Sequence, residues 1–117
     1  MPTRSSLLRI HDMLESILGI EKAIKGKSYR DYQRSWVLRS AVERGIEVIS
    51  EASRHLAREL KSQHKDVRWK DIAGIGNILR HEYHRISDTV IWNVVQHHLP
   101  PLRAAVSAIE AVLKEAP

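Results

Sequence analysis

Apolar residues recur every three or four positions along most of the chain, the spacing that places them on one face of an α-helix. The first series comprises Leu7, Ile10, Leu14, Ile17 and Ile24. A longer series begins near residues 31–33 and continues to about Leu60. Its members are Val37, Leu38, Ala41, Val42, Val48, Ile49, Ala52, Leu56 and Leu60. No comparable run alternates with the period of two that a strand requires, so the pattern predicts an all-α protein.

Helix-ending residues divide this pattern into five predicted helices. Ser5 or Ser6 is a candidate N-cap for the first helix, and the stretch "KGKSY" around Gly26 ends it. The second helix runs to about Leu60, and "WKDIAG" (residues 69–74) is expected to form a tight helical turn. The third helix covers about residues 73–83, and the fourth begins at Ser87 or Asp88. The fourth ends at the Leu99-Pro100-Pro101 stretch, because a residue before proline avoids the α region; a fifth helix follows to Leu113.

Composition sets limits on the protein class. A chain of 117 residues with 43% hydrophobic residues predicts one globular domain over residues 1–117, here an antiparallel five-helix bundle. The absence of cysteine excludes disulfides, cysteine–zinc sites and thiol catalysis. No apolar run is long enough for a membrane span, and the first residues lack the apolar core of a signal peptide. We therefore expect a cytoplasmic protein without a membrane partner.

The charge balance favours an anionic partner without proving one. The formal net charge is +5 and the isoelectric point is about 9.8. Lysine and arginine displace counterions from nucleic acid, so such a chain is compatible with RNA binding. A basic surface that merely keeps the protein in solution gives the same totals.

The segment from Arg80 to Ile86, "RHEYHRI", concentrates titratable side chains on a predicted helix. Positions three and four apart share a helix face, so Asn77, His81, His84 and Arg85 fall together, and Arg80 lies one turn before His84. One interpretation is a solvated helix end, where basic groups favour the helix dipole. The other is a phosphodiester site, in which imidazole transfers protons and guanidinium binds phosphate without a metal. A zinc site that uses His81 and His84 is a third option, but the usual carboxylate or cysteine ligands are missing.

Three stretches resemble the HepT-like toxins of the HEPN superfamily, which are partners of MNT-type nucleotidyltransferase antitoxins. They are "AVERGIEVISEASRHL", "WKDIAGIGNILRHEY" and "IWNVVQHHLPPL". The resemblance implies a five-helix bundle that forms a two-fold homodimer, and a metal-independent RNA endonuclease that needs no cofactor. The family motif is R-N-x-x-x-H-x-Y, which Asn77, His81 and Tyr83 match, whereas Gly76 stands at the arginine position.

The missing arginine leaves three interpretations open. Arg80 or Arg85, or the same residue of a second copy, supplies the guanidinium from a shifted place; the site binds RNA but cuts it poorly; or the chain is only a binding partner of its nucleotidyltransferase. A helical RNA-binding domain with neither role is a further possibility. On the first interpretation the catalytic residues are His81, Arg80, Asn77 and Arg85.

Tyr83 matches the tyrosine to which antitoxins of this kind transfer AMP. A bulky phosphate-bearing group beside His81 would block the site and repel RNA phosphate. A buried, hydrogen-bonded tyrosine is the ordinary alternative for this residue. The resemblance therefore implies a toxin that its antitoxin silences at Tyr83.

Overall fold

The computed structural model describes the backbone of residues 2–82 and 87–115, and the side chains of residues 4–79 and 87–115. Every regular element over these residues is helical, which confirms the all-α prediction. The order is α1 (Pro2–Ile24), α2 (Tyr29–Arg34), α3 (Trp36–Arg54), α4 (Arg58–Ser62), α5 (Trp69–Glu82), α6 (Asp88–Asn93), the π-helical η2 (Val94–His98) and α7 (Leu99–Glu115).

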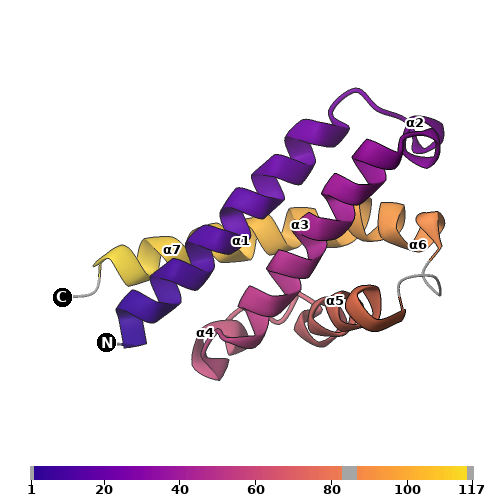
Figure 1. The fold of residues 1–117 in the computed structure, drawn as a ribbon. Coiled ribbons are helices and arrows are strands. Elements are labelled where there is room, and N and C mark those ends of the chain that lie inside the picture. Colours follow the sequence, from indigo (N-terminus) through magenta and orange to yellow (C-terminus); the bar gives the residue numbers. More distant parts are fainter. Residues whose placement is uncertain (1, 83–86, 116–117) are drawn as a thin grey trace.

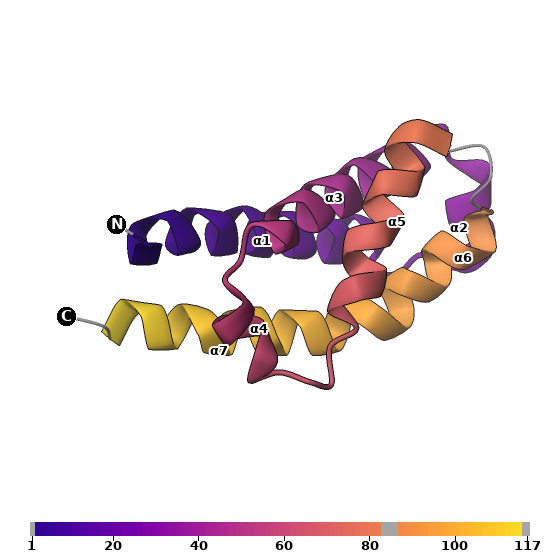
Figure 2. The same ribbon diagram turned by 90° about the horizontal axis from the view of Figure 1, so that it is seen from below.

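Two long helices, α1 and α3, lie antiparallel and side by side, as Figure 1 shows. α7 packs against α1, and α5 packs against α3. Figure 2, the view from below, shows α5 crossing between the region of α4 and that of α2 and α6. The beginning of α1 and the end of α7 lie at the same end of the bundle (Figure 1). This arrangement leaves α5 with one side against α3 and another side turned away from the bundle.

The core is aliphatic, as expected for a chain without phenylalanine. Its fully buried members come mainly from α1, α3 and α7 and include Ile10, Met13, Ile17, Val42, Ile49, Leu102 and Val106. Burying an aliphatic side chain of this size contributes about 1.5–3 kcal/mol, so the set as a whole holds these helices together. Trp92 acts as a packing anchor as predicted, with its ring 5.5 Å from that of the buried Tyr32.

The predicted second helix is three elements in the structure. α2 starts at Tyr29 with a capping box between Ser28 and Asp31. Ser35 then interrupts the helix, and its Oγ accepts a hydrogen bond of 3.0 Å from the Leu38 N–H, which caps α3. α3 ends at Arg54, before Leu60. The apolar spacing continues across these breaks, and for that reason spacing alone did not reveal them.

Two other predicted boundaries were wrong. α1 begins at Pro2, so Ser5 and Ser6 lie inside it. The predicted end of the fourth helix at Leu99 is also wrong, because η2 runs directly into α7 through Pro100 and Pro101. Leu99 keeps α-helical angles (φ −70°, ψ −40°), and its N–H donates to the Val94 carbonyl across a π turn. Proline lacks the N–H that would bond to a carbonyl one turn back. The prolines directly follow the π turn, where the regular bonding pattern of the helix is already interrupted.

The remaining boundaries agree better with the sequence. Gly26 ends the first helix region with a positive φ of 74°, a conformation that glycine adopts without steric cost. Ser87 Oγ accepts a hydrogen bond from the Val90 N–H and so caps α6, as predicted. Residues 69–74 are the first turns of α5 itself. Among the described helices, none is long and apolar enough to cross a lipid bilayer.

Candidate functional site on helix α5

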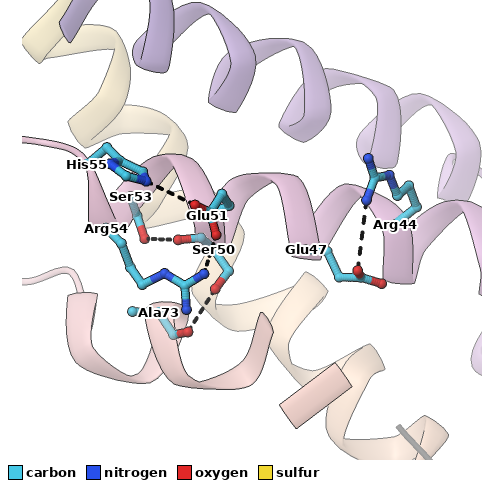
Figure 3. A network of polar contacts seen from close by, with 8 residues as sticks. All are labelled: Arg44, Glu47, Ser50, Glu51, Ser53, Arg54, His55 and Ala73. Carbon is cyan, nitrogen blue, oxygen red and sulfur yellow. Dashed lines mark hydrogen bonds and ion pairs between the residues drawn. The ribbon is translucent and has the colours of Figure 1, made fainter. Parts of the chain in front are cut away.

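The inner side of α5 is a tight contact with α3. Ile72 and Leu79 are buried there, and Gly76 is buried between them. A Cβ added at Gly76 would overlap the Cβ and Oγ of Ser50 and would lie 3.6 Å from the Ser50 Cα. Ser50 is itself completely buried, and its Oγ donates a hydrogen bond of 2.8 Å to the Ala73 carbonyl (Figure 3). The two helices therefore touch at a pair of very small residues.

In this packing the arginine of the resembled motif would not fit at position 76. Position 76 points at the backbone of α3, and Ser50 cannot swing away as the tip of a long side chain could. An arginine at this position would have to push α5 off α3. The loss of the motif residue is thus coupled to the packing of these two helices.

Small residues on α3 serve packing within the chain. Ser50, Ala52 and Ser53 are buried, and Ser53 Oγ donates to the Ser50 carbonyl at 2.8 Å. Gly45 lies against Ile20 of α1, where an added Cβ would come within 2.7 Å of the Ile20 Cδ1. From the sequence, we expect such residues to mark a seam between two copies, although packing within the chain would look the same. The contacts observed at these positions are within the chain.

The outer side of α5 carries the candidate site. Gly74, Asn77 and Ile78 are exposed, and backbone position 81 follows Asn77 by one helical turn within α5. Helical spacing predicts Ile75, Ile78 and Leu79 on the packed side of this helix. The prediction for Ile78 was wrong, since this residue is 38% exposed. A helix advances about 100° per residue, so Ile78 stands about 160° around α5 from Gly76.

A groove borders this outer side. It encloses about 470 Å³ between α5, α6 and η2. Its lining is mostly apolar and consists of Lys70, Asp71, Ile72, Gly74, Ile75, Ile78, Val90, Val94 and His98. Val90 is 48% exposed. The groove therefore places an uncovered apolar surface directly beside Asn77.

Most of the other predicted site residues lie outside the described part of the chain. Arg80 and His81 have their backbone in α5, but their side chains are not described; Tyr83 and Arg85 are not described at all. Within the described residues, no group of three histidine, cysteine, aspartate or glutamate side chains could hold a metal ion. The described part of the candidate site therefore consists of α5 up to Leu79, the groove beside it and the charged residues that flank it.

Two glutamates of α3 have pKa values that are shifted in opposite directions. The ring nitrogen of His55 lies 2.9 Å from Glu51, and the Arg54 guanidinium also contacts this carboxylate (Figure 3). These contacts lower the pKa of Glu51 to about 2. Burial, together with the nearby Asp88, raises the pKa of Glu43. One carboxylate is thus held charged, and the other is disfavoured as an anion.

Arg39, Glu43 and Glu47 follow one another at spacings of four, which predicts pairing of Arg39 with these glutamates. No such ion pair occurs among the described residues. Arg39 donates instead to the Gln33 carbonyl, which closes the link between α2 and α3. Arg44 pairs with Glu47 at 3.8 Å (Figure 3). An arginine that closes this link is less available as a phosphate ligand, so Arg39 is not a candidate for the missing guanidinium.

Sequence reasoning missed two features of the site. One is Ser50, whose fit against Gly76 links the altered motif to helix packing; the cluster of small residues on α3 was the available signal. The other is His98, which no motif singles out and which we would place on the surface, but which is half-buried and lines the groove. Only the position of η2 across the groove from α5 shows this, and local spacing carries no information about it.

The chain is similar in sequence to a known protein family over a range that includes α5. Residues 13–109 match the model of the family described as "Ribonuclease HepT-like". "Putative RNase TTE0752" from Caldanaerobacter subterraneus subsp. tengcongensis is 35% identical over 99 residues, covering 85% of this chain and 88% of that protein. "Putative RNase MJ1380" from Methanocaldococcus jannaschii is 30% identical over 100 residues, covering 86% and 92%.

A third relative carries the family name. "Probable ribonuclease HepT" from Thermococcus cleftensis is 28% identical over 94 residues, covering 80% of this chain and 86% of that protein. No solved protein structure matches the chain at a significant level. The matched ranges span all of α5, including its departure from the motif at Gly76.

Proposed function

This chain belongs to the HepT-like ribonuclease family, and we propose that it is a metal-independent RNA endonuclease whose active site is on the outer side of α5. One observation carries the proposal: α5 leaves Asn77 exposed and puts backbone position 81 one turn further along the same side. In this family context, His81 is the proton-transfer residue. Asn77, Arg80 and Arg85 complete the proposed catalytic set.

The proposed reaction uses the ribose 2′-hydroxyl as the nucleophile. Its oxygen attacks the adjacent phosphorus, the bond from phosphorus to the 5′-oxygen breaks, and a 2′,3′-cyclic phosphate forms. The 2′-hydroxyl gives up its proton, and the departing 5′-oxygen takes one. His81 handles proton transfer, a task for which imidazole is suited near neutral pH. A guanidinium stabilises the negative charge that develops on the phosphoryl oxygens.

The guanidinium has to come from outside position 76. Because Ser50 fills the space beside Gly76, the proposal assigns that role to Arg80 or Arg85, from the same copy or from a second one. Arg80 directly precedes position 81 on α5, and Arg85 lies one helical turn beyond His81 in the sequence.

A second copy of the chain completes this proposal. The apolar groove beside Asn77 is lined on α5 by Ile75 and Ile78 and on α6 by Val90. An uncovered apolar surface of this kind is typical of an interaction site. A two-fold homodimer over the groove would bring two copies of α5 together and place the two candidate sites side by side.

The test is RNA cleavage by the purified full chain in EDTA. We expect single-stranded RNA to yield fragments that end in a 2′,3′-cyclic phosphate. A matched RNA with 2′-O-methyl groups should stay intact, because it lacks the nucleophile. Cleavage that requires added metal, or that also cuts the methylated RNA, would contradict the proposed chemistry.

The proposal extends to regulation by a nucleotidyltransferase antitoxin of the MNT type, in a toxin–antitoxin system acting on cytoplasmic RNA. The Tyr83 hydroxyl oxygen attacks the α-phosphorus of ATP, pyrophosphate leaves, and the hydroxyl proton passes to solvent. Mass spectrometry after incubation with the antitoxin and ATP should show one added AMP, absent in Tyr83→Phe. Unmodified wild-type protein that still loses its activity on mixing would contradict this step.

A second function is favoured by the Gly76–Ser50 contact. If no shifted arginine replaces the motif residue, the chain is a weakened or inactive member of the family that binds its nucleotidyltransferase. Arg80→Gln and Arg85→Gln separate the two cases. Loss of cleavage in either variant supports the shifted arginine, whereas a wild type that binds the antitoxin and never cuts RNA supports the inactive partner.

A further inference from the structure

The positive charge of the chain is concentrated in two segments. Residues 54–70, called here the basic connection, contain six lysines and arginines and two acidic residues, a net formal charge of +4. Residues 22–34 contain five basic residues and one acidic residue, also +4. Since the whole chain carries +5, the rest of the sequence is net acidic. Outside the candidate site itself, these two segments are therefore the main places on the chain that would attract a polyanion.

The basic connection is firmly attached to the bundle by groups other than most of its charges. Leu56 and Val67 are buried at its two ends. The Trp69 indole N–H donates a hydrogen bond of 3.1 Å to the His64 carbonyl, and Lys61 Nζ donates to the Ser53 carbonyl at 3.2 Å. No residue of α4 is buried, and Figure 2 shows α4 at the edge of the bundle. The segment is thus a fixed support with outward-facing charges.

The side chains of three of these basic residues have neither an ion pair nor a hydrogen bond among the described residues. Arg54 pairs with Glu51 and Arg68 pairs with Asp71, but no such contact involves Arg58, Lys65 or Lys70. All three side chains are exposed. An exposed cation without a carboxylate neighbour keeps its full attraction for an incoming phosphate.

The connection leads directly into the candidate site. Lys70 stands exposed in the first turn of α5, and among the groove residues on this helix it is the one farthest along the chain from position 81. It precedes Asn77 by seven residues, or two turns, so both stand on the same side of α5, about 10 Å apart along its axis. The only acidic residue of α5 before Glu82 is Asp71, and Arg68 neutralises it with a contact of 2.6 Å. Residues 22–34 have no such continuity with α5.

We infer that the basic connection binds the RNA backbone on the side of α5 that leads away from position 81. An RNA strand held at Asn77 would pass Lys70 and then meet the unpaired cations Arg58 and Lys65. This inference rests on the proposed function, because it takes RNA as the substrate, and it adds where the strand runs. The contacts are with phosphates, so they are independent of base sequence.

The test compares two triple variants of the full chain that remove the same charge. Arg58→Gln, Lys65→Gln and Lys70→Gln together neutralise the basic connection. Arg30→Gln, Lys22→Gln and Lys25→Gln together are the matched control: also one arginine and two lysines, all exposed and without an ion-pair partner among the described residues. Thermal unfolding of both variants should stay close to that of the wild type, because surface changes of this kind are nearly neutral.

Binding is measured by fluorescence anisotropy with a 2′-O-methyl RNA, so the result does not depend on cleavage. We expect the connection variant to bind at least about tenfold more weakly at 0.1 M salt. The slope of log affinity against log salt should become shallower by about 2, because each neutralised phosphate of a single strand contributes about 0.7 to that slope. The control variant should bind almost as tightly as the wild type.

Three results would overturn the inference: equally weakened binding in both variants, which means a net-charge effect; unchanged binding in both; or unchanged RNA binding with abolished antitoxin binding, which means a protein partner. Failure of the nuclease proposal looks different. In that case the wild type cuts no RNA, yet the two variants still differ in their binding to the methylated RNA.

Discussion

The two sides of α5 differ in how closely they are packed: the inner side lies tightly against α3, and the outer side is exposed. On the inner side, Gly76 and Ser50 meet so closely that a single Cβ would not fit. On the outer side, Gly74 has no atom within 4 Å of an added Cβ, and Asn77 and Ile78 face away from the bundle. Neighbouring residues of one helix thus serve packing and, in our proposal, chemistry. The altered motif position belongs to the packing side, while its asparagine and histidine positions fall on the other.

Substitutions at Gly76 should affect the stability of the protein most. Gly76→Arg should lower the free energy of unfolding by more than about 3 kcal/mol, and Gly76→Ala by about 1–2 kcal/mol, because overpacking outweighs the gain in helix propensity. Gly74→Ala, two residues away, should instead raise it by about 1 kcal/mol. Urea denaturation measures all three. Two alanine variants that shift stability in the same direction would show that the sides of α5 do not differ as described.

A double variant sharpens the same point. Ser50→Gly removes the Cβ that an alanine at position 76 would strike, so it should recover part of the stability that Gly76→Ala removes. Alone, Ser50→Gly is destabilising, since it removes the hydrogen bond to the Ala73 carbonyl. We expect a coupling energy above about 1 kcal/mol in the mutant cycle. Strict additivity would mean that the two residues do not share one contact.

The outer side is tested by Ile78→Asp. A carboxylate in an apolar interface pays a desolvation cost, so the proposed homodimer should dissociate at concentrations at least about tenfold higher. Val112→Asp is the matched control, because Val112 is exposed (56%) and lies on α7, outside the groove. Analytical ultracentrifugation reports both. If the Ile78→Asp variant dimerises as tightly as the wild type, the groove is not the dimer interface.

The smallest expected effect concerns the polar flank of the inner contact. The pKa of Glu51 is about 2 in the folded chain, below its ordinary value of 4.5. Its charge therefore stabilises the fold above pH 4.5, and this contribution is lost as the pH falls from 4.5 toward 2. Glu51→Gln should lower the melting temperature slightly at pH 7, with a difference that shrinks in acid.

Glu43→Gln is the control with the opposite sign. Because burial and Asp88 raise the pKa of Glu43, its charge opposes folding at neutral pH, and the variant should be slightly more stable there. A melting temperature that falls equally in both variants at pH 7 would contradict these assignments.

Sequence determined the fold class but missed several boundaries, and the reasons are physical. Helical periodicity identified the apolar face of α1, since it depends only on spacing. For α3 it was right in part: Leu38 and Val42 are buried, but Val37 is 70% exposed. It did not reveal the break at Ser35, because the apolar series continues on both sides of it. Nor did it anticipate the passage through Pro100, where a π turn accommodates the prolines.

The candidate site stays a prediction from the family motif, and the structure describes the side chain of only one of its members, Asn77. Asn77 lies on an exposed face as expected, whereas Ile78 was assigned to the wrong side, because spacing alone did not say which side of α5 meets α3. The reason for Gly76 was beyond local reasoning, since it depends on Ser50, far away in the sequence. Such contacts between helices require the fold.

The most direct test of the account is the RNA cleavage rate of His81→Ala, measured in EDTA together with its unfolding free energy. Removing a general acid–base catalyst costs about 10²–10⁴-fold in rate, so we predict a loss of that size with stability nearly unchanged. His11→Ala, at an exposed histidine of α1, should cut RNA at the wild-type rate. Equal cleavage by wild type and His81→Ala, or equal inactivity of both, would contradict the claim that the outer side of α5 performs the chemistry.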